Sequence, residues 1–79
     1  MIKLSKKRPT SKDGNSWMKS GMFQGFAVSI EYNAQHDCYF YSTAKNGYVN
    51  SSKWDGITFK TEEECTKALE EYVRGNING

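Results

Sequence analysis

Residues 61–75 have the sequence TEEECTKALEEYVRG, which contains a start signal, an apolar stripe and a stop signal for one α-helix. Thr61 has the properties of an N-cap: its hydroxyl is placed to accept from the Glu64 amide, while the Glu64 carboxylate reaches back to the Thr61 amide. Gly75 is expected to end the helix in a left-handed conformation. The apolar residues between them have the spacing of one helical face: Cys65, Ala68, Leu69, Tyr72 and Val73. The sequence therefore predicts an amphipathic helix that packs on upstream elements.

Upstream of this helix, short segments are rich in aromatic and β-branched residues. Residues 26–32, FAVSIEY, alternate apolar and other residues, as a half-buried strand does. Residues 38–43, CYFYST, predict a second strand with apolar side chains on both faces. Asn46-Gly47 favours a type I′ hairpin turn, because both central residues of that turn need a positive φ. Residues 48–53 and 57–59 are then expected to form a third strand and a short fourth strand.

Strand alternation sorts the side chains onto two faces of this sheet. The residues expected to face the helix are Phe26, Val28, Ile30, Phe40, Val49, Ile57 and Phe59. The residues expected on the other side are Ala27, Ser29, Glu31, Tyr39, Tyr41, Thr43, Tyr48, Asn50 and Ser52. Tyrosines beside small polar residues are typical of a protein contact surface. We therefore predict partner binding at Tyr39, Tyr41, Tyr48, Glu31 and Asn50.

A chain of 79 residues is expected to form one domain, of the α+β class. We predict a three- to four-stranded antiparallel β-meander over residues 17–79, with the C-terminal helix packed on one face. Residues 1–16 are expected to form a flexible basic arm, with a short edge strand at residues 2–5. Trp17, Met18, Met22 and Phe23 form an apolar patch without clear periodicity, which is expected to cross one end of the core.

The charges are unevenly distributed along the chain. Up to residue 25 there are six basic residues and one acidic residue, whereas from residue 26 onward five basic residues accompany eight acidic ones. A basic arm suits a phosphate backbone or an acidic protein surface, and an acidic helix suits a basic partner. The residues of the arm with the chemistry for nucleic-acid binding are Lys6, Lys7, Arg8, Lys12 and Trp17.

Catalytic and metal-binding patterns are not evident in the sequence. His36 is the single histidine, and a zinc site needs three or four ligands at defined spacing. Glu62, Glu63 and Glu64 are explained by the favourable interaction of acids with the N-terminus of a helix. We therefore expect a protein that is not an enzyme, with no cofactor, no metal and no small-molecule substrate.

Location and redox state follow from the same composition. No segment has the roughly 20 consecutive apolar residues of a membrane span, and the N-terminal residues lack the apolar stretch of a secretion signal. We predict a cytoplasmic protein that does not bind membranes. Cys38 and Cys65 are then expected to be reduced thiols.

Function is predicted to be stoichiometric binding to a larger protein or ribonucleoprotein. Short chains rich in Lys, Asn and Tyr, without catalytic residues, are common on phages and mobile elements, where small folds block host machinery. The concrete form predicted here is an inhibitor of a host nuclease or of a CRISPR-type defence complex. The alternative is a small DNA- or RNA-binding accessory protein that uses the basic arm and exposed aromatic rings.

Overall fold

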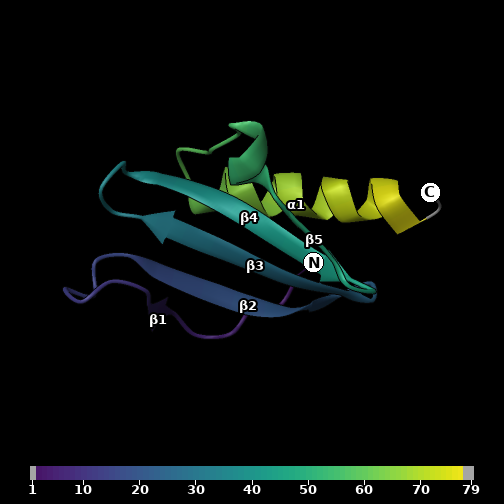
Figure 1. The fold of residues 1–79 in the computed structure, drawn as a ribbon, viewed down its shortest axis with the longest axis horizontal. Coiled ribbons are helices and arrows are strands. Elements are labelled where there is room, and N and C mark those ends of the chain that lie inside the picture. The colour runs from purple at the N-terminus through teal and green to yellow at the C-terminus, as the bar shows by residue number, and fades with distance from the viewer. Residues whose placement is uncertain (1, 78–79) are drawn as a thin grey trace.

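The computed structural model describes residues 2–77, which form a five-stranded antiparallel sheet with one α-helix packed on one face (Figure 1). The strands follow one another as a meander, in the order β1-β2-β3-β4-β5. Their bounds are Arg8–Pro9 (β1), Trp17–Phe23 (β2), Phe26–Asn33 (β3), Cys38–Lys45 (β4) and Tyr48–Ser51 (β5). A 3-10 helix, η1, covers Ser52–Asp55, and the α-helix, α1, covers Glu62–Ile77. The α+β class is confirmed, with five strands instead of three to four.

Two tight turns with left-handed residues connect the central strands. Asn46 (φ 53°) and Gly47 (φ 84°) join β4 to β5, which confirms the predicted type I′ turn. Gln24 (φ 54°) and Gly25 (φ 83°) join β2 to β3 in the same way. Such turns match the right-handed twist of the flanking strands, so they fix the register of both hairpins.

Strand β2 was not predicted, because its inner face does not alternate as a buried strand should. The inward positions of β2 include Lys19 and Gly21, which lie opposite Ile30 and Val28 of β3. Lys19 forms an ion pair with Glu62 of α1, with 2.7 Å between Nζ and Oε2. At Gly21 an added Cβ would lie 2.5 Å from the Lys3 carbonyl oxygen, so the absence of a side chain lets the N-terminal segment approach β2. Both exceptions to the pattern therefore have a structural cause.

The N-terminal segment packs along the outer edge of β2. Ile2 is 8% exposed and belongs to the hydrophobic core, and its amide donates to Glu70 Oε1 of α1 at 3.2 Å. Ser5 donates its amide to the Ser20 carbonyl at 2.7 Å, and β1 then pairs with Trp17 and Met18. The strand predicted at residues 2–5 is wrong, since the pairing strand covers Arg8–Pro9. Residues 2–9 thus cover this edge of the sheet.

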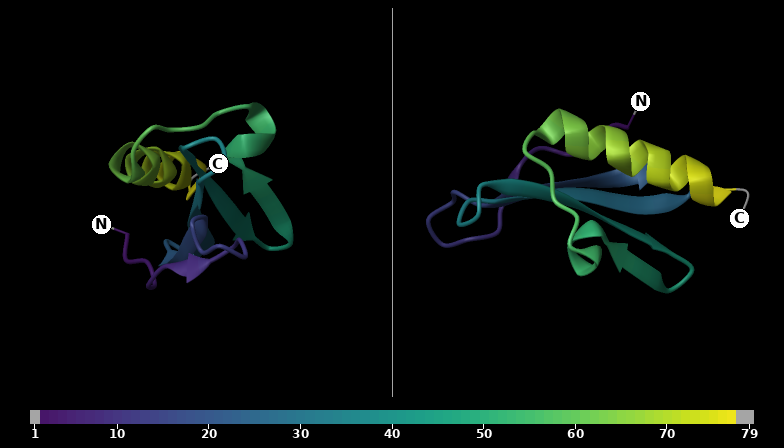
Figure 2. Two further views of the ribbon diagram at one scale, coloured as in Figure 1. Left: turned by 90° about the vertical axis from the view of Figure 1, so that its left-hand side faces the viewer. Right: turned by 90° about the horizontal axis from the view of Figure 1, so that it is seen from above.

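The helix packs as its apolar stripe predicts. Cys65, Leu69 and Val73 are fully buried against Val28 and Ile30 of β3. Figure 2 shows α1 lying along this face of the sheet. The N-cap is confirmed, because the Glu64 amide donates to Thr61 Oγ1 at 3.1 Å. The Glu64 carboxylate, however, accepts from the Thr61 hydroxyl.

The predicted end of the helix at Gly75 is wrong. The helix continues to Ile77, and Gly75 is not among the glycines with positive φ.

The chain leaves β5 earlier than predicted. The Ser51 side chain accepts from the Lys53 amide and caps η1, and Gly56 ends η1 in the left-handed conformation. The buried Ser52 hydroxyl accepts from the Tyr41 amide at 3.0 Å, which ties η1 to β4. The predicted fourth strand reduces to one bridge between Phe59 and Tyr39.

The predicted faces are right for β3 and wrong for β4. Tyr41 lies opposite Ile30, and Thr43 lies opposite Val28, so these β4 residues face α1. Tyr39 faces α1 as well, whereas Phe40 points to the other side. Alternation could not distinguish the two faces of CYFYST, since both are apolar.

The assignment of the residues after β4 is corrected as well. In β5, Asn50 lies opposite Thr43, on the side of α1, and Tyr48 shares that side. Val49 and Ile57, which were expected to face the helix, are 58% and 48% exposed. Ser52, which was expected on the far side, is buried in η1.

Candidate binding surface

The side of the sheet that α1 does not cover is the candidate binding surface, and we call it the open face (Figure 2). Strand register arranges its side chains in rows that cross the strands. The middle row consists of the serines Ser20, Ser29, Ser42 and Ser51, each opposite the next. The row beside it, nearer the hairpin turns, consists of Met22, Ala27, Ala44 and Val49. The open face is thus built largely from small side chains.

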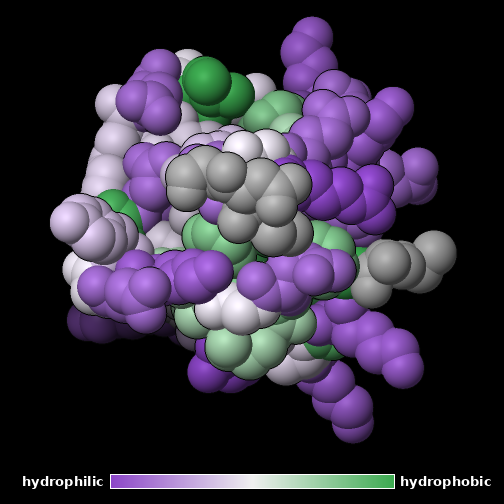
Figure 3. All heavy atoms as spheres, turned by 90° about the vertical axis from the view of Figure 1, so that its right-hand side faces the viewer, coloured by the Kyte–Doolittle hydropathy of each residue, from purple (hydrophilic) through white to green (hydrophobic). Residues whose placement is uncertain are grey.

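The apolar row is accessible to solvent. Met22 is 67% exposed and Val49 is 58% exposed, at the two ends of the row, and the smaller alanines lie between them. Ser20, Ser29 and Ser42 of the serine row and the whole apolar row line a shallow groove of about 390 Å³, whereas Ser51 is buried. In Figure 3, which shows the adjoining end of the molecule, hydrophilic side chains predominate and apolar atoms form small patches between them.

Charged and aromatic residues border the serine row on its other side. Glu31 lies opposite Phe40, and the Lys53 ammonium lies 5.3 Å from the centre of the Phe40 ring. Arg8 Nη2 donates to Ser20 Oγ at 2.7 Å, at the β1 end of the face. The open face therefore has positive charge at both sides and a carboxylate between them.

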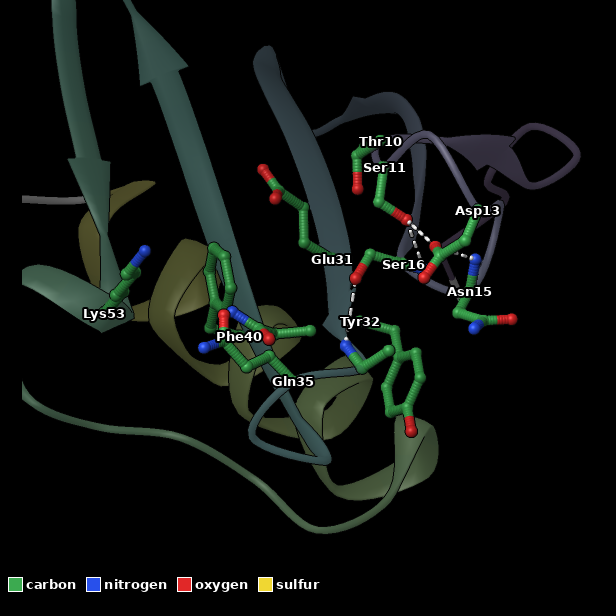
Figure 4. A pocket seen from close by; sticks show the side chains of 12 residues that line it. Thr10, Ser11, Asp13, Asn15, Ser16, Glu31, Tyr32, Gln35, Phe40 and Lys53 are labelled. Carbon is green, nitrogen blue, oxygen red and sulfur yellow. Dashed lines mark hydrogen bonds between the residues drawn. The ribbon is translucent and has the colours of Figure 1, made fainter.

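A polar pocket of about 540 Å³ adjoins this border, between the loop of residues 10–16 and η1 (Figure 4). Glu31, Phe40 and Lys53 line one part of it, and Phe40 lies between the two charged side chains in the view of Figure 4. Asp13 lines the other part. Its carboxylate accepts from the Ser11 hydroxyl and from the Asn15 amide, and these hydrogen bonds lower the pKa of Asp13. Ser11 and Asp13 thus stabilise the shape of the loop.

The five residues predicted to bind a partner are not brought together. Tyr41 packs on the helix side, 5.8 Å from the Tyr72 ring, and desolvation raises the pKa of its phenol. Asn50 Nδ2 donates to the Tyr72 hydroxyl at 2.9 Å. Tyr48 is 83% exposed at the end of β5. Glu31 lies on the open face.

Tyr39 belongs to an aromatic cluster on the helix side. Its ring centre lies 4.8 Å from that of Tyr32 and 5.9 Å from that of Trp17. The Tyr32 hydroxyl donates to Asp37, and this hydrogen bond raises the pKa of Tyr32.

The residues predicted to bind nucleic acid lie along the β1–β2 edge. The Lys7 ammonium lies 4.6 Å from the Trp17 ring centre, and that of Lys19 lies 5.4 Å away. Lys6, Arg8 and Lys12 are exposed. The ammonium groups of Lys7 and Lys19 therefore lie around the ring of Trp17, the aromatic residue that was predicted to contact nucleic acid.

Metal-ligating and nucleophilic residues are dispersed. Within residues 2–77 there is no group of three or more His, Cys, Asp and Glu side chains placed to hold a metal ion. Cys38 and Cys65 are free thiols. Burial raises the pKa of the Cys65 thiol to about 12, so this thiol is a poor nucleophile in the folded protein. Among the same residues, no helix has the length and apolar character needed to cross a bilayer.

From the sequence, Met22 was expected at one end of the core, and Ser29 was the one residue of the serine row expected on the far side of the sheet. Met18, Ser20 and Met22 alternate with inward residues once β2 is recognised, and Gln24-Gly25 would have marked the turn after it. Glutamine is not a usual first residue of a type I′ turn, so the signal was weak.

The chain matches no protein-family model, and neither a curated protein nor a solved structure matches it. The function proposed below therefore rests on the residues of the open face.

Proposed function

We propose that this protein acts without catalysis, by stoichiometric binding of a larger protein to the open face. One observation carries the proposal: an apolar row, with Met22 and Val49 at its exposed ends, crosses four strands of the uncovered side of the sheet. Contiguous apolar surface of this kind, bordered by polar residues, is typical of protein interaction sites. Met22 and Val49 are too exposed to contribute to the core, so burial against a partner would explain why these positions are apolar.

The composition of the open face supports the same proposal. Serine and alanine side chains are short, so a partner can approach the sheet backbone closely along the groove. Arg8, which donates to Ser20, and Glu31 and Lys53, which line the adjoining polar pocket, place both signs of charge beside the serine row. Charges at the border of an interface contribute mainly to orientation and association rate, while the apolar centre contributes affinity.

The narrower proposal, inhibition of a host nuclease or CRISPR-type complex, is supported by the acidic surface of α1. Glu63, Glu64 and Glu71 are exposed there, and an acidic helix complements a basic nucleic-acid channel. Because α1 and the open face lie on opposite sides of the sheet, substitutions separate the two modes of binding.

The test is affinity capture from host lysate followed by mass spectrometry, with matched variants. We expect the wild-type protein to retain one partner at a fixed ratio. Substitution of both Met22→Asp and Ala27→Asp should abolish retention, because it places two carboxylates in the apolar row. Glu71→Lys tests binding through the acidic residues of α1, and the exposed Lys67→Ala on the same helix is the control, which should retain the partner. Circular dichroism confirms that each variant is folded.

Two results would overturn the proposal. Loss of the partner with Glu71→Lys but not with the open-face variant would assign binding to α1. Recovery of nuclease-sensitive mixtures would favour the nucleic-acid alternative, which the cluster of exposed Lys6, Arg8 and Lys12 supports. In that case affinity would fall steeply with salt, and neutralising Lys6, Lys7 and Arg8 together would reduce the salt dependence by about two to three contacts. Our proposal expects such binding to vanish near physiological salt.

A further inference from the structure

Glu31 is the only acidic residue in the five strands, and its side chain lies on the open face. It is half-buried between two apolar cross-strand neighbours, Met18 of β2 and Phe40 of β4. The ion pairs in the described part of the chain use Glu62 and Glu70, and no dashed line reaches the Glu31 carboxylate in Figure 4. The charge of Glu31 therefore has no ionic partner within this part of the chain.

Two basic side chains border this part of the open face, but each makes another contact. Arg8 Nη2 donates to Ser20 Oγ at 2.7 Å. The Lys53 ammonium lies 5.3 Å from the centre of the Phe40 ring, and Figure 4 shows this ring between Lys53 and Glu31. A carboxylate beside apolar side chains loses part of its hydration without compensation unless a cation pairs with it. A cation supplied from outside the chain would provide that compensation.

The surroundings of Glu31 favour arginine as the source of this cation. Glu31 and Phe40 line the polar pocket of about 540 Å³, which has room for a long side chain. A guanidinium group is less strongly hydrated than an ammonium group, and it forms two parallel hydrogen bonds with a carboxylate. Thr10, Asn33 and Gln35 also line the pocket, and their side chains carry oxygens that can accept from the remaining N–H groups.

We propose that Glu31 binds an arginine side chain of the partner protein, which enters the polar pocket while neighbouring residues of the partner cover the apolar row. This inference deepens the proposed function and rests on it. Glu31 and Ala27 of the apolar row are four residues apart on β3, which is about 13 Å in a strand. The partner must therefore present an arginine about 13 Å from the apolar side chains that cover this row.

A small arginine compound tests the site without knowledge of the partner. The probe is Nα-acetyl-arginine amide, titrated at low salt into the isotope-labelled protein and followed by amide chemical shifts. We expect saturable shifts that centre on Glu31 and Phe40. Nα-acetyl-citrulline amide has the same shape without the charge, so it should bind more than about tenfold more weakly. Equal affinity for the two compounds would overturn the proposal.

Two matched variants assign the binding to one carboxylate. Glu31→Gln keeps the size of the side chain and removes its charge, so it should lower the affinity for the arginine compound by more than about tenfold. Asp55→Asn removes the same charge at an exposed position that does not line the pocket, and it should bind as the wild type does. Unchanged affinity in Glu31→Gln would also overturn the proposal.

The arginine site and the proposed function can fail separately. If a partner is retained through Met22 and Ala27 but neither the arginine compound nor that partner responds to Glu31→Gln, the arginine site alone is wrong. If the compound binds at Glu31 but no protein is retained through the open face, the proposed function is wrong. If both are right, Glu31→Gln should weaken the purified partner's affinity by more than about tenfold, and Asp55→Asn should not change it.

Discussion

Cys65 connects the packing of a single residue to the pH dependence of stability. It lies fully buried between α1 and the sheet, and desolvation, followed by the charge of Glu62, raises the pKa of its thiol from 9.0 to about 12. Between these two pH values the unfolded thiol loses its proton while the folded one keeps it. The folded state then binds more protons than the unfolded state, so stability falls as pH rises.

We therefore expect the wild-type free energy of unfolding to decrease between pH 9.0 and about 12 more steeply than that of Cys65→Ala. Urea unfolding at several pH values measures both slopes. Val73→Ala is the control, since it removes buried side-chain volume from the same helix without removing a titratable group, and it should keep the wild-type slope. Equal slopes for wild type and Cys65→Ala would show that the thiol does not titrate in this window.

Strand β2 could not be predicted from the sequence because two of its residues depart from the alternation of a half-buried strand. Lys19 and Gly21 sit at inward positions of β2, where apolar side chains are expected. The ion pair with Glu62 and the close approach of Lys3 explain them, but both depend on segments far away in the chain. Local sequence therefore could not identify β2, and the exposed Met22 was missed with it.

At the scale of elements, α1 was predictable because its signals are local. The cap and the apolar stripe are all within residues 61–73. Strand β3 and the Asn46-Gly47 turn were predictable for the same reason. Strand β4 was placed correctly, but its face is set by its register with β3, and a one-residue change of register exchanges the faces. Consequently Tyr39 and Tyr41 were assigned to a binding surface, although they pack beneath α1.

The contribution of α1 can be measured with two substitutions. Leu69→Ala should lower the free energy of unfolding by about 2 to 5 kcal/mol, because it leaves a cavity at a fully buried site. Thr61→Ala should cost about 1 kcal/mol through loss of the hydrogen bond to the Glu64 amide. Denaturant unfolding measures both, with the exposed Lys67→Ala as the control. Equal and negligible losses would contradict the packing described for α1.

For the whole molecule, the question is whether the N-terminal segment is a dispensable arm or a part of the core. The flexible basic arm expected from the sequence would be dispensable for the fold, and truncation before Trp17 would then leave the fold intact. Ile2, however, lies in the core and donates to Glu70, and Ser5 pairs with Ser20. We expect deletion of residues 1–5 to lower the melting temperature markedly, and Ile2→Ala alone to cost about 2 to 5 kcal/mol.

Thermal unfolding followed by circular dichroism measures this effect. Lys6→Ala is the control, because its side chain is exposed and its loss removes charge without packing. A truncated chain that melts at the wild-type temperature would show that residues 2–5 do not contribute to the core.

The hydrogen bond from the Ile2 amide to Glu70 spans 68 residues, and this separation has a kinetic consequence. The hairpins of β2 to β5 join sequence neighbours, whose loops close at little entropic cost, so we expect them to form before Ile2 meets α1. We therefore expect the meander to be the rate-limiting nucleus of folding. Changes at Ile2 or Leu69 would chiefly accelerate unfolding, while changes at the two turns would slow folding. The contacts between the two ends of the chain, at Ile2 and Leu69, would thus determine how long the native state persists more than how fast it forms.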